Sequence, residues 1–326
     1  MKRLALVLLH CVFVTLLMAQ QPPAVEVTPL PQKAFPRSIP PGNYSGITWL
    51  GGNRYAVVSD KSAADGFFIF EIDTDSVTGE ITAARNTGFY SSGEPNRDDE
   101  GIAFCPQTNT LFISGESDNV IREHHLDGSL TGRGIQPAAP YKTLPGNLGL
   151  EALSYDSATQ RLWTCNESGN VYIQSYDKQL RPCDTYAYRL DAPTADRQKA
   201  LSYAHGIGTV CALPDGNLLL LEREFFVPKK RLGAFVNCKL FVLNVSQYAS
   251  DRQQTVPPSP QKTLLATWKT KLTLFGRSLA NYEGMCLGPA LKDGSRVIIV
   301  VADSQNQYKG VLRDWFKSLR LTTVRR

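Results

Sequence analysis

The sequence lacks the short motifs that mark several common catalytic sites. It has no GxSxG nucleophile elbow, no ArgHisGly motif, no HExxH and no glycine-rich loop for phosphate. Only four histidines occur, and no basic run accompanies the net charge of +5. These absences argue against an α/β-hydrolase esterase, a histidine acid phosphatase, a zinc protease of the HExxH type and a nucleic-acid-binding protein.

Long hydrophobic runs are also scarce, because only one occurs. It extends from Leu4 to Met18, follows Lys2 and Arg3, and precedes the small residue Ala19. This order is typical of a secretory signal peptide, and the run is shorter than the roughly 20 residues of a membrane span. We expect a signal peptide over residues 1–19, a periplasmic or extracellular product and no membrane insertion after cleavage. A membrane anchor and lipidation of Cys11 are the weaker alternatives.

The cysteines form no recognisable framework. Six of the seven follow the expected cleavage site, and none belongs to a CxxC pair. An exported protein can form disulfides, but four of these cysteines lie in strand-like runs where buried thiols are common. Six cysteines allow 15 pairings, and the spacing selects none of them.

A repeated pattern does occur, in which a polar residue precedes Gly or Ala and an apolar strand. Its small residues are Gly46, Gly101, Ala152, Gly206 and Gly284. A period of about 50 residues indicates a repeat architecture. Each copy continues through a turn into a second apolar run, and several show a third and a fourth. Four short strands per repeat predict an all-β fold, a single β-propeller.

The number of blades stays open between five and six. The long interval from Gly206 to Gly284 holds either one blade with an insertion or a degenerate sixth. Residues 20–40 form an N-terminal arm in which AVEVTPL, residues 24–30, can supply the outer strand of the last blade. N- and C-terminal strands would then close the ring, with the propeller domain over residues 41–326.

The strand heads carry the candidate metal site. In a propeller the first strand of each blade lines the channel, so the residues before the repeated small residues should meet at one mouth. They are Ser45, Glu100, Glu151, His205 and Glu283. Converging carboxylates repel one another unless a cation neutralises them, and oxygen ligands suit Ca²⁺. We therefore expect calcium to be held by Glu100, Glu151 and Glu283, with Asp99 and Asp303 as further metal ligands.

The ends of the second strands should lie near the same mouth. Acids there, together with Arg97, Arg223 and Lys61, can bind a metal and an anion side by side. We expect these three basic residues to bind substrate, and His205, Arg223 and Glu222 to be catalytic. For each outer residue the competing interpretation is a polar cap on a strand end, and His205 can equally be structural.

Five segments resemble a known family: SGITWL, DDEGIAF, NLGLEALSYDSATQRLWTCNES, LLLLEREF and NYEGMCLGPALKDGSRVIIVVADSQN. Their order is similar to that of the phytase-like family, labelled "esterase-like activity of phytase", over roughly residues 40 to 320. The resemblance implies a secreted bacterial β-propeller acting on phosphoric or carboxylic esters. It places motif positions at Glu100, Glu151, Glu222, Arg223, Glu283 and Asp303.

Two departures from that family stand out. The AspAspPro motif of calcium-dependent β-propeller phytases is missing, so the resemblance does not imply phytate as the substrate. The segment DWFKSLR, residues 314–320, replaces a plain closing strand.

Two functions follow from these expectations. The first is a metal-dependent phosphoester or ester hydrolase whose site lies at the channel mouth and takes a small phosphorylated or ester substrate. The second is a non-catalytic propeller, stabilised by calcium, that binds a ligand or a protein. We expect a monomer that binds no nucleic acid.

Overall fold

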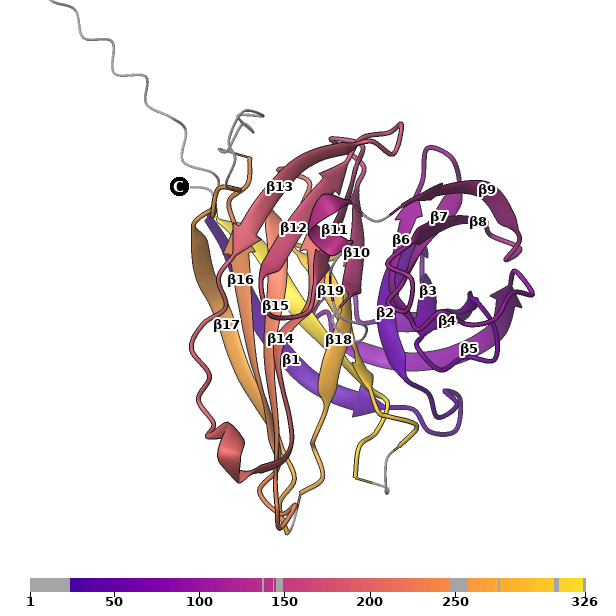
Figure 1. Cartoon of the computed structure of the whole chain (residues 1–326). Coiled ribbons are helices and arrows are strands. Elements are labelled where there is room, and N and C mark those ends of the chain that lie inside the picture. The colour runs from indigo at the N-terminus through magenta and orange to yellow at the C-terminus, as the bar shows by residue number, and fades with distance from the viewer. Residues whose placement is uncertain are drawn as a thin grey trace, which may run out of the picture.

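The fold is a ring of five four-stranded antiparallel sheets in the described part of the chain (Figure 1). The computed structural model describes residues 24–136, 138–142, 144, 149–246, 257–274, 276–307 and 311–324. The expected signal peptide therefore lies outside the described residues. The β-propeller prediction is confirmed, and the number of blades is five.

The first two blades follow the chain directly. One contains β2 (Tyr44–Gly51), β3 (Arg54–Ser59), β4 (Gly66–Thr74) and β5 (Ile81–Ser91). The next contains β6 (Asp99–Cys105), β7 (Thr110–Gly115), β8 (Ile121–His125) and β9 (Leu130–Ile135). Each strand pairs with the next one in sequence, because the short turns between them permit only antiparallel neighbours.

The third and fourth blades are built in the same way. The third contains β10 (Leu150–Asp156), β11 (Arg161–Asn166), β12 (Val171–Tyr176) and β13 (Pro182–Tyr188). The fourth contains β14 (Ala200–Ala212), β15 (Leu218–Pro228), β16 (Phe235–Leu243) and β17 (Lys262–Lys271). Its strands extend well beyond the ring in Figure 1. These long strands and the long connection between Leu243 and Lys262 together account for the interval that left room for a sixth blade.

The last blade joins the two ends of the described chain. It contains β18 (Asn281–Ala290), β19 (Arg296–Asp303), β20 (Trp315–Val324) and, on its outer edge, β1 (Ala24–Ala34). The expected closure by both chain ends is confirmed. The expected irregular ending at DWFKSLR is wrong, because Trp315–Val324 is a regular strand whose Phe316 and Leu319 are fully buried.

Buried apolar side chains fill the spaces between neighbouring blades. One core cluster joins the fourth and last blades through residues such as Leu219, Tyr282 and Leu319, and others lie between the remaining pairs. In the described part of the chain the helices are two short 3₁₀ turns, η1 (Ala139–Tyr141) and η2 (Arg197–Lys199). Within the described residues, no helix is long and apolar enough to cross a membrane.

The small residues of the repeat permit close contact between inner strands. A Cβ atom on Gly46 would lie 2.4 Å from the Glu100 carbonyl oxygen, and one on Gly101 would lie 2.5 Å from the Leu153 backbone nitrogen. Both positions therefore require glycine. The same close approach brings the strand heads of neighbouring blades together around the axis.

Closure by β1 gives a first prediction. Val27 is buried in the cluster between the fourth and last blades, so Val27→Asp should lower the free energy of unfolding by about 3 kcal/mol, because it buries an unpaired charge. Chemical denaturation measures this loss. The neighbouring Glu26→Ala should change stability by less than about 0.5 kcal/mol, and equal effects of the two substitutions would contradict a structural role for β1.

Candidate functional site at the channel mouth

A β-bulge interrupts every inner strand, near the start in four blades and beyond the middle of β14 in the fourth. The register between the first and second strands shifts by one residue in each blade, leaving Ser45, Glu100, Glu151, Gly208 and Glu283 without a ladder partner. Bulges re-aim side chains and are common next to active sites. We call these five residues the axial ring. It contains the three glutamates predicted from the sequence, brought to equivalent positions.

His205 does not belong to the axial ring. It pairs with Glu224, three residues before Gly208. The prediction took Gly206 as the repeated small residue, whereas the register gives that position to Thr209. The sequence GIGT offers two glycines, and β14 begins earlier than the other inner strands, so the pattern matched the wrong glycine.

The second strands contribute an outer ring at the same mouth. At the equivalent position in each blade, just beyond the bulge, lie Asp60, Glu116, Glu167, Arg223 and Asp303. Four blades therefore carry an acid here, and the fourth carries Arg223. The two rings together hold seven carboxyl groups and one guanidinium.

Arg223 forms ion pairs with carboxylates of both rings. Its Nη2 lies 2.8 Å from Glu283 Oε1, 3.0 Å from Glu167 Oε1 and 3.5 Å from Glu151 Oε1. Gly208 leaves space for it, since a Cβ there would lie 3.3 Å from Arg223 Cδ and 2.7 Å from the Tyr282 carbonyl oxygen. Arg223 thus acts as an internal counter-ion, and these ion pairs leave its Nη2 little capacity for an anionic substrate.

Burial raises the pKa of each axial glutamate well above its usual range. For Glu100 the neighbouring carboxylates of Glu151 and Glu283 raise the pKa further. For Glu151 and Glu283 the Arg223 guanidinium opposes the rise. Among the described residues, the half-buried Glu100 carboxyl has no hydrogen-bond or ion-pair partner. It is the least compensated acid of the mouth.

The donor set of the two rings matches the oxygen chemistry that calcium prefers. Within the described ranges, however, no group of three or more His, Cys, Asp or Glu side chains is arranged to hold a metal ion. Binding would therefore require the glutamate side chains to turn toward a common point.

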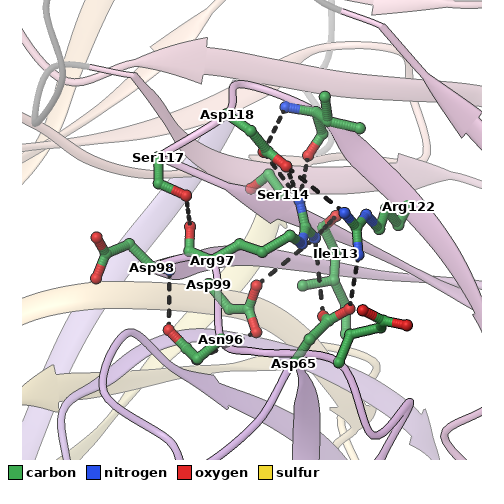
Figure 2. A network of polar contacts seen from close by, with 12 residues as sticks. Asp65, Asn96, Arg97, Asp98, Asp99, Ile113, Ser114, Ser117, Asp118 and Arg122 are labelled. Carbon is green, nitrogen blue, oxygen red and sulfur yellow. Dashed lines mark hydrogen bonds and ion pairs between the residues drawn. The ribbon is translucent and has the colours of Figure 1, made fainter.

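Arg97 and Asp99 lie in a separate, buried network between the first two blades (Figure 2). Arg97 Nη1 lies 3.0 Å from Asp118 Oδ1, and Arg97 Nη2 lies 3.6 Å from Asp99 Oδ1 and 3.8 Å from Asp65 Oδ1. Arg97 also donates to the carbonyl oxygens of Ile113 and Val120. The structure thus places neither residue where it can contact a substrate in the mouth.

The remaining predicted residues have mixed positions. Lys61 is exposed at the rim, where its ammonium contacts the carboxylates of Asp60 and Asp98. Glu222 points away from Arg223, because side chains alternate along β15, and it accepts hydrogen bonds from Tyr188 Oη at 2.7 Å and Lys262 Nζ at 2.6 Å. Asp303 lies in the outer ring and accepts from the Gln305 N–H at 2.6 Å.

A cleft opens beside the rings and contains His205. Its volume is about 510 Å³, and its walls include Glu167, Arg197, Tyr203 and His205. Arg197 and Tyr203 were missed by the sequence reasoning, since neither belongs to the repeated pattern. The cleft connects a ring acid, Glu167, with a cation and an imidazole, which is a suitable combination for binding a polar substrate.

Two buried acids, Asp99 in the network between the first two blades and Asp303 in the outer ring, make stability depend on pH. Burial raises the pKa of Asp99 to about 8 and that of Asp303 to about 7. The folded protein therefore retains protons that the unfolded chain releases, so the free energy of unfolding should fall as pH rises from about 5 to 8. Urea unfolding with a chelator present measures this. Asp303→Asn should reduce the slope, whereas a flat or rising profile would contradict these shifts.

Comparisons with solved structures return matches at low similarity. A glucose dehydrogenase-like putative oxidoreductase from Thermus thermophilus is 11% identical with a TM-score of 0.42, covering 92% of this chain and 100% of that one. Hydrazine synthase from Kuenenia stuttgartiensis is 10% identical with a TM-score of 0.40, covering 85% and 81%. The WD40 β-propeller domain of Doa1 is 10% identical with a TM-score of 0.38, covering 90% and 96%.

The family comparison is more informative. No curated protein matches the chain. Residues 39–305 match the phytase-like family, described as "Esterase-like activity of phytase". The match begins just before the first inner strand, ends just after Asp303 and includes both rings. The chain therefore belongs to the phytase-like family of β-propellers.

Proposed function

We propose that this protein hydrolyses phosphoric or carboxylic esters at the channel mouth. The observation that carries the proposal is Glu100, an acid at the axis that has no partner among the described residues. Burial and the neighbouring carboxylates raise the pKa of Glu100. Carboxyl groups with raised pKa values cluster at catalytic sites, where they act as general acids or bases. The family description, "Esterase-like activity of phytase", supports the reaction class.

In this proposal the cleft beside the rings holds the substrate. Arg197 and His205 in its wall would contact the polar part of the ester, and Glu167 connects the cleft to the axial ring. Arg223 keeps Glu151, Glu167 and Glu283 in place through its ion pairs. Arg223 would thus be a positioning residue, while Glu100 and His205 would face the reacting group.

We also propose that calcium binds at the mouth. Seven carboxyl groups face one guanidinium in the two rings, so a negative excess remains for a cation to neutralise, and a phosphate ester would otherwise be repelled. Glu151 and Glu283 would hold the ion together with Asp303 of the outer ring, while Glu100 would stay uncoordinated as the proton-transferring acid. The ion would supply Lewis-acid polarisation of the ester oxygen. Export to the periplasm or the medium, and a monomeric state, belong to the same proposal.

A calcium titration tests the metal. At pH 8, calcium at a hundredfold excess over its dissociation constant should raise the free energy of unfolding by about 2.7 kcal/mol, and a chelator should reverse this. Glu151→Gln should weaken the effect, whereas Glu80→Gln, which alters an exposed acid far from the rings, should not. No stabilisation of the unmodified protein, or equal stabilisation of Glu151→Gln, would contradict calcium binding.

Substrate assays test the reaction. The protein without residues 1–19 should hydrolyse at least one of p-nitrophenyl phosphate, p-nitrophenyl acetate and phytate, and a chelator should lower the rate. If a chelator leaves turnover unchanged, the protein is a hydrolase and the metal takes no part in the reaction. No turnover of any of the three with calcium present would contradict the proposal for these substrate classes.

A non-catalytic propeller that binds a ligand is the second candidate function. The described part of the mouth shows no free nucleophile beside a base, since Ser45 Oγ donates to the Asp99 carbonyl oxygen at 2.7 Å. Calcium-dependent stabilisation without turnover would favour this function.

A further inference from the structure

A second cavity lies at the opposite end of the channel from the two rings. Its volume is about 360 Å³, and the C-terminal halves of all five inner strands contribute to its wall. From Ser45 in the axial ring to Trp49 in this wall, β2 advances four residues, or roughly 13 Å. The cavity is therefore a separate site, independent of the proposed ester hydrolysis.

Aromatic and apolar side chains form most of its wall. Trp49, Phe104 and Tyr155 come from three different blades, and each is only half-buried. Met285 and Leu287 of the last blade add flexible and branched apolar surface. Pockets of about 300–1,000 Å³ with such walls are typical of small-molecule sites.

One cation among the lining residues is available to a ligand. Arg296 lies over the Trp49 ring at 5.7 Å from its centroid, and its Nε and Nη2 donate to the Gly288 carbonyl oxygen at 3.2 and 2.7 Å. These contacts hold the guanidinium at the wall. Its Nη1 has no hydrogen-bond partner among the described residues.

The acid in the same wall is already satisfied. Asp156 is buried and accepts hydrogen bonds from the Ala158 N–H at 2.9 Å and the Thr159 hydroxyl at 2.5 Å, both within its own turn. Its negative charge disfavours a polyanion, while Arg296 supplies a single positive charge. The balance suits a ligand with one negative charge.

We propose that this cavity binds a small molecule with a flat apolar body and a single carboxylate. The apolar body would pack between Trp49, Phe104 and Tyr155, and the carboxylate would accept a hydrogen bond from Arg296 Nη1. Calorimetry with 2-naphthoate tests this directly, and 2-naphthamide is the uncharged probe of the same shape. Naphthoate should bind at least tenfold more tightly than the amide.

Matched substitutions locate the binding. Arg296→Met should remove the preference for naphthoate. Arg313→Met is the control, because Arg313 also lies over a tryptophan, Trp315, at 5.9 Å from its centroid, but outside this cavity. Glu100→Gln at the other mouth should leave naphthoate affinity unchanged, which separates this site from the ester site.

Three results would overturn the proposal: no binding of naphthoate, equal affinity for the two probes, or equal loss of the preference in Arg313→Met and Arg296→Met. If Arg296→Met does not fold, Ser157→Trp replaces it. Ser157 is an exposed turn residue at the edge of the cavity, so a tryptophan there should obstruct the cavity and weaken naphthoate binding at least tenfold. Unchanged affinity in Ser157→Trp would also overturn it.

Discussion

Arg223→Met should lower the free energy of unfolding by about 3–5 kcal/mol at pH 8, because removing one partner leaves buried charges uncompensated. The guanidinium pairs with Glu151, Glu167 and Glu283, and all of these residues are buried or nearly so. Equilibrium denaturation measures the loss.

The loss should depend on pH with a definite sign. Burial already raises the pKa of Glu151 and Glu283, and Arg223 opposes that rise. Without the guanidinium these carboxyls retain protons to higher pH, so the deficit should be small at pH 5 and should grow toward pH 8.

Arg85→Met is the matched control for this substitution. Arg85 pairs with Glu71 on the surface, where its side chain is 62% exposed, and such a pair contributes about 0–1 kcal/mol. If Arg223→Met costs no more than Arg85→Met at pH 8, Arg223 is not the counter-ion of the mouth.

Glu100→Gln should lower ester hydrolysis by about 100-fold or more, which is the usual minimum contribution of a general acid or base. It should not lower thermal stability. The amide has the same shape as the carboxyl group. In the unmodified protein, burial and then repulsion from Glu151 and Glu283 raise the pKa of Glu100, and the uncharged amide is free of that repulsion. Initial rates on whichever test substrate is turned over, together with thermal unfolding, measure both effects.

Glu123→Gln is the opposite control. Glu123 is buried in the second blade, where it pairs with Arg133 at 3.2 Å and accepts from the Thr110 hydroxyl at 2.7 Å. This change should lower stability and leave the rate per folded molecule unchanged. Full activity of Glu100→Gln would show that Glu100 takes no part in the reaction. A large loss of stability in the same variant would show that the Glu100 carboxyl group has a partner in the folded protein.

The repeated strand heads could be identified from the sequence because two local requirements coincide there. A small residue is needed where the next inner strand approaches, as at Gly46 and Gly101, and apolar strands must follow it. Such a pattern is visible in one sequence without any contact information. It predicted the propeller and the grouping of Glu100, Glu151 and Glu283, whereas the closing strand near Val27 was predicted separately from the apolar segment at residues 24–30.

The fourth blade marks the point where this reasoning failed. Gly206 fits the pattern, but the bulge lies at Gly208, and only the ladder between β14 and β15 distinguishes them. The same ladder assigns Arg223 to a position that is acidic in the other four blades. Likewise, alternation along β15 separates Glu222 and Glu224 from Arg223, although the three are consecutive in the sequence.

The sequence by itself therefore determined the propeller fold, the acids at the strand heads and the family, since each depends on residue order within a repeat. Tertiary structure alone decided how those acids are neutralised. Arg223 of the fourth blade pairs with Glu151 of the third blade and Glu283 of the last, and Arg97 is committed to Asp65, Asp99 and Asp118. Ion pairs of this kind depend on register and burial between segments far apart in the chain, which no local pattern records.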